Sequence, residues 1–429
     1  MSSDLSVFTT HESEVRSYCR NFPTVFTRAA GHLLTDAGGR QYVDFLMGAG
    51  SLNYGHNEAA IKREVARYLE QDGILQSLDL HTAAKAEFIE HLVEHVLAPR
   101  GLRYKLQFTG PTGTNAVEAA LKLARKVTGR TNVVAFTNAY HGMSLGSLAA
   151  TADRKARRGA GIALPGVTAM PFDGYLGPDQ STLHYIERML APGSGVEPPA
   201  AFILETVQAE GGLNTASPAW LEGLQRIARA HDALLIVDDI QAGCGRTGRF
   251  FSFEGTGLTP DLIVLSKSLS GLGLPLSLVL IRPDLDAWSP AEHNGTFRGN
   301  NLAFVGGAAA IRAYWRDRRL EEDVERRSRI ARHALEAFAG QLPPGAARVK
   351  GRGLMLGLEM DEDGLAVAVS RAAFARGLIV ETCGVRDQVL KLLPPLNIPD
   401  EALRAGLDLL AESMDEVLSK SARVAVTHA

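Results

Sequence analysis

The sequence predicts an α/β fold in which helices cover a mostly parallel β-sheet, with a smaller second sheet near the chain ends. Short apolar runs bounded by polar turns recur along the middle of the chain, which is typical of buried strands. They cover residues 105–108, 133–137, 201–205, 234–238, 262–266 and 277–281. Stretches with apolar residues at helical spacing, such as 116–127 and 219–231, lie between several of these runs. This alternation favours parallel strands, because a helix carries the chain back to the start of the next strand.

The two ends of the chain carry a different pattern, which predicts a smaller α+β domain. Residues 31–44 resemble a hairpin with its turn at 36–39. Helical patterns at 304–315 and 323–342 precede further apolar runs, which cover 348–360, 378–382 and 389–393 and predict the second sheet. We expect both ends to share one small domain. The predicted division is 1–60 (small domain), 61–310 (large cofactor-binding domain) and 311–429 (small domain).

The composition is that of an ordinary globular protein. Of the 429 residues, 45% are hydrophobic and 22% are charged, and the formal net charge of -3 predicts no attraction to nucleic acid or anionic membranes. Cys19, Cys244 and Cys383 are too few and too scattered for a disulfide framework or a zinc site. The first residues do not resemble a signal peptide, and no apolar stretch approaches the length of a membrane span. We therefore expect a cytoplasmic protein that acts on small molecules.

Two apolar runs end in side chains that suit one cofactor. Lys267 follows the run at 262–266, and Asp238 ends the run at 234–238. Ligands bind at the carboxyl ends of parallel strands, so this amine and this carboxylate are expected in one crevice. Pyridoxal phosphate requires such a pair, because a lysine condenses with its aldehyde while an acid keeps its pyridine nitrogen protonated. Taken alone, each residue has a plainer interpretation, as a solvated strand end or as a helix cap.

A segment rich in Gly, Pro and Thr predicts a phosphate site. Thr112, Gly113 and Thr114 open the helical stretch, where unpaired backbone N–H groups and the positive end of the helix dipole attract an anion. An ordinary helix cap after a turn is the alternative. The segment matches neither the dinucleotide-binding fingerprint nor the P-loop.

Further polar residues follow other strands of the same predicted sheet. Tyr140 and His141 come after the run at 133–137, and Tyr140 offers an aromatic face to a planar ring, although a core tyrosine is the alternative. Asp238 and Gln241 lie three residues apart at the end of their strand, so one can hold the ring nitrogen while the other reaches the phenolic oxygen of the cofactor. His141 is a candidate general base, but we assign proton transfer to Lys267.

In their order along nearly the whole chain, these residues resemble the class III, fold type I, pyridoxal-phosphate aminotransferases. The resemblance rests on Thr112 to Thr114, Tyr140 to Gly142, 205–212, 238–248, Lys267, Gly295-Thr296 and Pro394-Pro395-Leu396. It implies a seven-stranded, mostly parallel sheet, and homodimers or dimers of dimers with the active site at the subunit interface. Lys267 would then hold the cofactor, Asp238 would contact its ring nitrogen, and Tyr140 would stack on its ring.

The resemblance also implies roles for residues that bind phosphate and substrate. Gly113 and Thr114 would bind the phosphate from one subunit, and Thr296 would reach it from the other. Glu210 matches the glutamate that, in ornithine and 4-aminobutyrate aminotransferases, pairs with a carboxylate-binding arginine and swings aside for the second substrate. Here the position of that arginine is Lys391, a point charge instead of a bidentate fork, which puts the way 2-oxoglutarate is held in question.

The departures from the wider family resemble one subgroup, the diaminobutyrate:2-oxoglutarate transaminases of ectoine biosynthesis. They are Lys391 and Arg298-Gly299 in place of a Gly-Gly pair, and the shared motifs lie at 12–20, 52–56, 238–246 and 295–301. This subgroup implies a reaction between L-glutamate and L-aspartate 4-semialdehyde, which gives L-2,4-diaminobutyrate and 2-oxoglutarate.

Two positions are atypical even for that subgroup and leave alternatives open. Gln76-Ser77 stands where a His-Gly pair is expected, and Ala209 stands where a glycine is expected. A transaminase for another omega-amine or semialdehyde is one alternative, and an aminomutase or racemase that uses the same cofactor is another. A cofactor-binding regulator would need a basic DNA-binding segment, which the sequence does not show.

Overall fold

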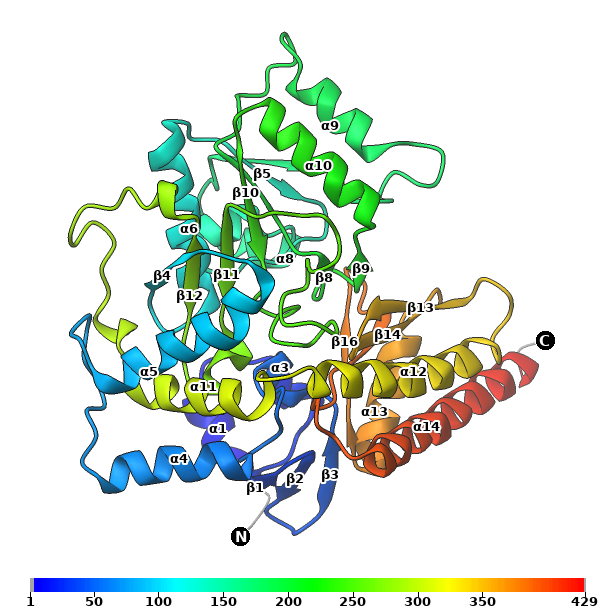
Figure 1. Ribbon diagram of the computed structural model, residues 1–429. Helices are drawn as coiled ribbons and strands as arrows, with labels where there is room; N and C mark the ends of the chain where they lie inside the picture. Colours follow the sequence, from blue (N-terminus) through cyan, green and yellow to red (C-terminus); the bar gives the residue numbers. More distant parts are fainter. Residues whose placement is uncertain (1–3, 428–429) are drawn as a thin grey trace.

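The computed structural model describes residues 4–427 and places a seven-stranded sheet in the middle of the fold (Figure 1). The strand order is β4-β12-β11-β10-β7-β5-β6, with β12 antiparallel to both neighbours and the other adjacent pairs parallel. The strands are β4 (Lys105–Phe108), β5 (Val133–Phe136), β6 (Val167–Met170), β7 (Ala201–Leu204), β10 (Leu234–Asp238), β11 (Leu262–Leu265) and β12 (Leu278–Ile281). The six predicted strands are confirmed, and β6 is the strand for which no run was predicted.

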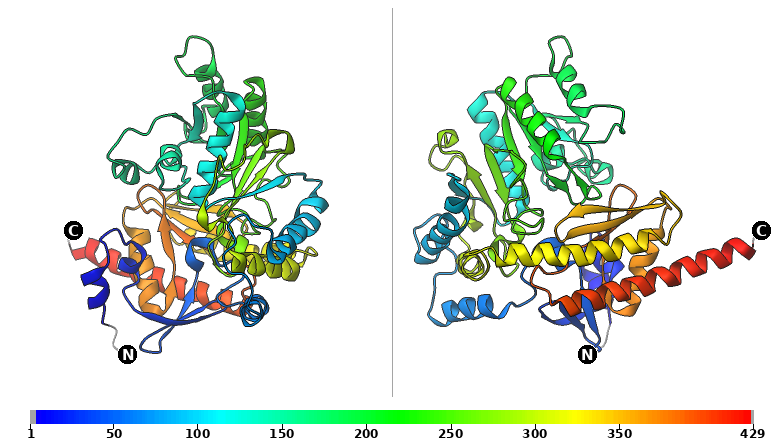
Figure 2. Two further views of the ribbon diagram at one scale, coloured as in Figure 1. Left: turned by 90° about the vertical axis from the view of Figure 1, so that its left-hand side faces the viewer. Right: turned by 45° about the vertical axis from the view of Figure 1, so that its right-hand side comes forward.

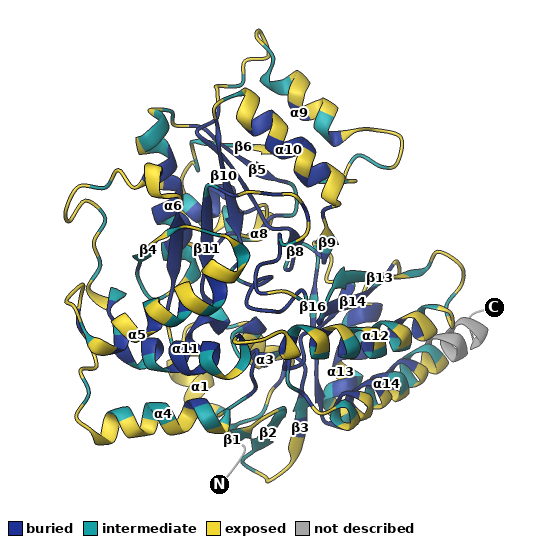
Figure 3. Cartoon of the chain, in the orientation of Figure 1, coloured by how far each residue is buried: buried dark blue, intermediate teal, exposed yellow. Residues whose placement is uncertain are grey.

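Side chains of the central strands alternate between two apolar layers, as the period of two residues requires. In β5, Val133 and Ala135 join the layer that contains α6, whereas Val134 and Phe136 join the layer that contains α5, α10 and α11. These helices are α5 (Ala83–His91), α6 (Gly113–Thr128), α10 (Pro218–Ala230) and α11 (Asn301–Tyr314). The central strands are accordingly buried (Figure 3). The predicted alternation of strands and helices is confirmed.

The two chain ends meet in two smaller sheets, with orders β1-β2-β3-β15 and β13-β14-β17-β16. The strands are β1 (Phe26–Ala30), β2 (Leu33–Asp36), β3 (Gln41–Asp44), β13 (Ala347–Arg352), β14 (Met355–Met360), β15 (Leu378–Ile379), β16 (Glu381–Cys383) and β17 (Val389–Leu392). The single strand predicted at 378–382 is wrong, because the chain separates at Val380 and β15 pairs with β3 while β16 pairs with β17. Both ends lie on the same side of the central sheet (Figures 1 and 2).

Three helices of the C-terminal third share an apolar core with the second small sheet. They are α12 (Arg319–Ala339), α13 (Leu365–Arg376) and α14 (Asp400–Thr427). Phe45, from the N-terminal end, is fully buried in the same core. The predicted boundaries at 60 and 310 fall inside α4 (Ala59–Glu70) and α11, so the division into three segments stays a prediction.

Short helices and turns complete the described part of the chain. They are α1 (Ser6–His11), α2 (Tyr18–Asn21), α3 (Met47–Gly50), a π-helix (Leu92–Leu97), α7 (Leu145–Ala150), α8 (Arg154–Arg158), α9 (Thr182–Leu190), the β8 (Val207–Gln208) and β9 (Asn214–Thr215) pair, and 3₁₀ turns that include η3 (Lys267–Ser270) and η5 (Thr296–Arg298). Within residues 4–427, no helix combines the length and the apolar character that crossing a bilayer requires.

Candidate active site

The loops that follow β4, β5, β7, β10 and β11 carry the predicted site residues at one edge of the central sheet. These strands run in the same direction, so their carboxyl ends meet where α/β folds bind ligands. His141, after β5, contacts Asp238, at the end of β10. Gly113, at the start of α6, lies so close to Ile240 that a Cβ atom would stand 2.8 Å from its Cδ1. The fold therefore brings most of the predicted residues together.

Lys267 begins the 3₁₀ turn η3, directly after β11. Its φ angle of 50° lies in the left-handed region, which is strained for a residue with a side chain. The flanking Ser266 and Ser268 hold this turn, because their hydroxyls donate to backbone carbonyls at 2.7 and 2.8 Å. The strained backbone is thus fixed by buried hydrogen bonds on both sides of the lysine.

The amine of Lys267 has no hydrogen-bond or ion-pair partner within residues 4–427. Burial lowers the pKa of Lys267 to about 8, against the opposing charge of Glu210, and the positive charge of Lys391 lowers it further. A lysine with this pKa has an appreciable fraction of free amine near neutral pH, which is the nucleophilic form.

Asp238 is buried and paired with His141. Asp238 Oδ2 lies 2.7 Å from His141 Nδ1, and Asp238 Oδ1 accepts a hydrogen bond from the backbone of Ile240 at 3.2 Å. Burial acts to lower the pKa of His141, but the hydrogen bond to Asp238 and its charge outweigh burial, so the pKa is raised. His141 thus fixes the orientation of the Asp238 carboxyl group, at the position predicted to contact the ring nitrogen.

Glu205, after β7, is a second buried acid beside this pair. Its carboxylate accepts hydrogen bonds from the backbone N–H of Tyr140 at 3.0 Å and of Ala209 at 3.3 Å. Burial raises the pKa of Glu205 to about 7, and the charge of His141 opposes that rise. Glu205 thereby fixes the backbone of Tyr140, a residue that remains 36% exposed.

Gln241 connects the site to the N-terminal end of the chain. Its Nε2 donates to the carbonyl of Ala49 at 2.7 Å. Ala49 lies in α3 (Met47–Gly50), where all four residues have positive φ angles. A hydrogen bond from Gln241 also helps to lower the pKa of Glu210. The predicted contact of Gln241 with the cofactor stays a prediction.

The start of α6 offers unused backbone donors, as the sequence predicted. The N–H groups of Gly113 and Thr114 have no acceptor among the described backbone and side chains, whereas Thr112 N donates to Asn115 Oδ1 at 3.2 Å. The hydroxyl of Thr114 is already engaged with Ser144 at 2.6 Å. Backbone N–H groups at a helix N-terminus are therefore the donors available to a phosphate here.

Gly142 packs tightly against the start of α6. A Cβ atom on Gly142 would stand 2.5 Å from Thr114 Oγ1, and the φ angle of Gly142 is +128°. Only glycine satisfies both conditions, because any side chain would push Thr114 and the start of α6 aside.

Lys391 is fully buried and lies between two carboxylates. Its Nζ is 2.7 Å from Glu210 Oε1 and 3.2 Å from Glu381 Oε1. Burial alone would lower the pKa of Lys391, but the two carboxylates raise it well above its usual value. Burial raises the pKa of Glu381 to about 7, and the charge of Glu210 adds to that rise while Lys391 opposes it. Sequence analysis missed Glu381, which the pairing of β16 with β17 sets directly opposite Lys391.

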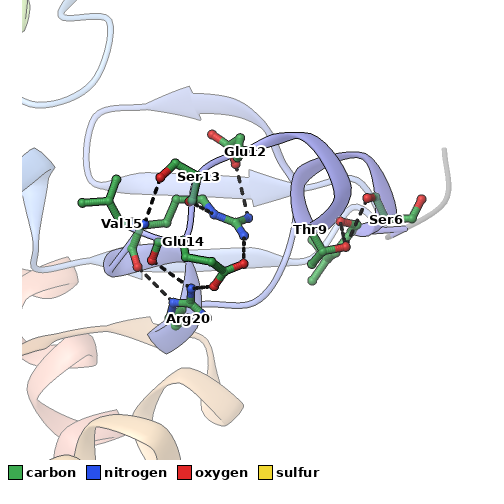
Figure 4. A network of polar contacts seen from close by, with 9 residues as sticks. Ser6, Thr9, Glu12, Ser13, Glu14, Val15 and Arg20 are labelled. Atoms are coloured by element: carbon green, nitrogen blue, oxygen red, sulfur yellow. Dashed lines mark hydrogen bonds and ion pairs between the residues drawn. The ribbon is translucent and has the colours of Figure 1, made fainter.

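Tyr18 reaches the same cluster from the N-terminal segment and was also missed. Burial and the charges of Glu381 and Glu210 raise the pKa of Tyr18. The segment around it is held by its own polar contacts (Figure 4). In these contacts Arg20 pairs with Glu14, and Arg16 Nε donates to Ser13 O at 2.9 Å. Within the motif at 12–20, identified from the sequence as a subgroup feature, Tyr18 is the residue on which the charges of Glu381 and Glu210 act, although its side chain is 47% exposed.

Thr296 is not brought to the Lys267 cluster within one chain. It is exposed in η5, and its carbonyl accepts a hydrogen bond from Gln76. The neighbouring Ser77 N donates to Gly299 O at 3.0 Å, and Arg298 pairs with Asp79. The atypical Gln76-Ser77 pair thus joins the loop after α4 to the loop that contains Thr296, the residue predicted to reach the phosphate of the other subunit.

The donor set suits pyridoxal phosphate. Among the described residues it offers a lysine amine without a partner, a buried acid paired with a histidine, a partly exposed tyrosine ring and unused N–H donors at a helix start. Away from this site, His91, Glu94 and His95 place ligand atoms within 4.8 Å of one another, and burial lowers the pKa of His95 while the charge of Glu94 opposes that shift.

Comparisons with known proteins agree with this chemistry. The Aminotransferase class-III family matches residues 15–414. The diaminobutyrate–2-oxoglutarate transaminase of Bordetella parapertussis is 54% identical over 97% of this chain and 96% of its own length. An uncharacterized aminotransferase, y4qG, of Sinorhizobium fredii is 56% identical over 96% of this chain and 92% of its own. The crystal structure of ornithine aminotransferase from Toxoplasma gondii has a TM-score of 0.84 at 26% identity, over 97% of this chain and 95% of that one. The chain belongs to the class III aminotransferases, which use pyridoxal phosphate.

Proposed function

We propose that this chain transfers an amino group between L-glutamate and L-aspartate 4-semialdehyde, which gives L-2,4-diaminobutyrate and 2-oxoglutarate. The observation that carries the proposal is the arrangement around Lys267. Its amine has no partner among the described residues, and its pKa responds to the Lys391 cluster, which consists of Lys391, Glu210 and Glu381. The chain is also 54% identical to a transaminase named for this reaction. The two half-reactions share one site, so ping-pong kinetics are expected.

Each named residue has one task in this proposal. Pyridoxal phosphate, when bound, supplies an aldehyde that accepts the amino group and a ring that withdraws electron density from the reacting carbon. Lys267 Nζ carries the proton from the reacting carbon of the donor, because its pKa of about 8 suits a base near neutral pH. Asp238, oriented by its contact with His141, would hold the protonated ring nitrogen. Tyr140, Gly113 and Thr114 orient the ring and the phosphate.

We infer that two copies of the chain assemble, so that Thr296 of one faces the site of the other. The loop that docks on η5 exposes large apolar side chains, a feature of surfaces that become buried in assemblies. They are Ile74, Leu75, Leu78, Leu80 and Phe297, all at least 45% exposed. Cytoplasmic localisation and a place in ectoine biosynthesis belong to the same proposal. Light scattering on the purified protein tests the assembly, and a monomer that is fully active would contradict it.

A substrate panel tests the reaction. Diaminobutyrate, ornithine, 4-aminobutyrate, lysine and β-alanine are offered separately as donors to 2-oxoglutarate, and diaminobutyrate is expected to be preferred. Preference for another amine would favour a related pathway, an alternative motivated by Gln76-Ser77 and by the uncharacterized relative. With ¹⁵N-diaminobutyrate, label in glutamate is expected, and rearranged diamine without labelled glutamate would indicate an aminomutase.

A further inference from the structure

The three members of the Lys391 cluster differ in how deeply their side chains are buried. Glu210 is the accessible member, with its side chain 29% exposed, whereas Lys391 and Glu381 are 0% and 5% exposed. Glu210 therefore lies on the solvent side of Lys391, whereas Glu381 is enclosed. Glu381 and Lys391 are also neighbours in register across β16 and β17, which fixes their separation.

The cluster contains more acid than base. Two carboxylates share one ammonium, and the buried Glu381 Oε1 has no partner among the described residues besides Lys391 Nζ, at 3.2 Å. A buried, poorly satisfied carboxylate is costly, and protonation relieves that cost. A third carboxylate beside Lys391 would add another negative charge to the same place. The positive charge of Lys391 alone cannot offset three acids.

The two proposed substrates place opposite demands on this cluster. Glutamate carries a carboxylate on its reacting carbon, whereas the carbon that reacts in diaminobutyrate carries hydrogen. Glu210 raises the pKa of Lys267 and Lys391 lowers it, so the charges of this cluster act on the lysine that is proposed to move the proton. One pocket must therefore accept a carboxylate in one half-reaction and none in the other.

We propose that Glu381 determines this dual specificity by taking up a proton from solvent when a substrate carboxylate binds beside Lys391, and by releasing it when that substrate leaves. The inference rests on the proposed function, since it explains how that pair of substrates shares one site. Glu381 acts through Lys391 and is a positioning residue. The titratable groups that face it are Lys391, Glu210, Lys267, Tyr18 and Cys383.

The sign of the pH dependence follows from the charges. A neighbouring ligand carboxylate raises the pKa of Glu381 further, so binding is linked to proton uptake above about pH 7 and not below it. Affinity for the carboxylate is then retained at low pH and falls about tenfold for each pH unit above that range, which is the limit for one linked proton.

Glutarate tests this linkage in the holoenzyme, because it has two carboxylates but no amino or keto group and is not turned over. Calorimetry at pH 6.5 to 8.5, in buffers of different ionisation enthalpy, measures Kd and proton uptake together. The wild type is expected to take up close to one proton at pH 8. Glu381→Gln is expected to take up almost none, and to bind glutarate at least about tenfold more tightly than the wild type at pH 8.5.

Two further variants serve as controls for the assignment of the proton uptake to Glu381. Glu359→Gln removes a carboxyl from β14 of the same sheet, where it pairs with Arg348 and Lys350, and should behave as the wild type. Glu381→Asp keeps a titrating group and should keep the uptake. Equal proton uptake by the wild type and Glu381→Gln, or none by the wild type, would overturn the proposal. Since glutarate does not react, loss of diaminobutyrate turnover with intact linkage would overturn the proposed function alone.

Discussion

Two buried lysines in one site behave in opposite ways. The amine of Lys267 has no partner in the part of the chain that the structure describes, and burial lowers its pKa to about 8, whereas Lys391 is fully buried between two carboxylates that raise its pKa well above the usual value. Their backbones differ as well, since Lys267 sits in a left-handed turn and Lys391 in a regular strand. The comparison shows that burial alone does not decide the charge of a lysine, because the partners do. The lowered pKa favours the free amine of Lys267, whereas the raised pKa favours the ammonium form of Lys391.

Lys267→Ala gives the largest expected effect. The variant should lose at least about 10⁴-fold in turnover, because the group that moves the proton at the reacting carbon is gone. Steady-state transamination with glutamate measures the loss, and bound cofactor is checked by absorbance. Normal transamination by this variant would remove the distinction between the two lysines.

Lys391→Met should instead reduce the stability of the fold. It leaves the carboxylates of Glu210 and Glu381 without their cation, and loss of one partner from a buried ion cluster costs about 3 kcal/mol or more. Urea unfolding measures the change, which should grow from pH 6 to pH 8 because unpaired buried carboxyls have raised pKa values and must ionise.

Lys420→Met is the matched control for that change. Lys420 pairs with Glu416 but its side chain is 72% exposed, so the unfolding free energy should hardly change. Equal losses in the two variants would show that the Lys391 cluster is no more than an ordinary surface pair.

The pKa of Lys267 predicts how fast the cofactor-free protein captures pyridoxal phosphate. The free amine reacts, so the rate should rise about tenfold per pH unit below pH 8 and level off above it. Stopped-flow absorbance measures this rate. Glu210→Gln should move the midpoint to lower pH, because the charge of Glu210 raises the pKa of Lys267. A rate that stays flat from pH 6.5 to 9 would contradict the account.

The smallest expected effect concerns the turn that carries Lys267. Ser268→Ala removes the hydrogen bonds of Ser268 Oγ to Gly50 O at 2.8 Å and from Asn53 N at 3.0 Å. The unfolding free energy should fall by about 1–2 kcal/mol, since buried backbone groups are left unpaired. Ser270→Ala is the control, because the buried hydroxyl of Ser270 has no partner among the described residues. A larger loss for Ser270→Ala would contradict the role given to Ser268.

Much of the fold could be predicted because the central strands are apolar on both faces. β6 escaped prediction because it lies at the sheet edge, where Val167 and Thr168 are only partly buried and Ala169 is exposed. The split at Val380 was also missed, because neither glycine nor proline interrupts residues 378–383 where the chain passes from one sheet to another.

A candidate site residue could be identified from the sequence where it ends a strand, as Asp238 does, or lies just past one, as Lys267 does. Glu381 was not, because its partner Lys391 lies ten residues on and only the strand pairing makes them neighbours. The turn around Gly384 between two apolar runs was the available signal for that hairpin. Tyr18 left no comparable signal, because its approach depends on how the N-terminal segment folds back.

The central claim is that the cofactor is joined to Lys267 and not to Lys391. Borohydride reduction of the holoenzyme, followed by digestion and mass spectrometry, reads out which lysine carries it. We expect the added pyridoxyl mass on the peptide that contains Lys267 and an unmodified Lys391. A label on Lys391, or an unlabelled Lys267 in protein saturated with cofactor, would contradict the account.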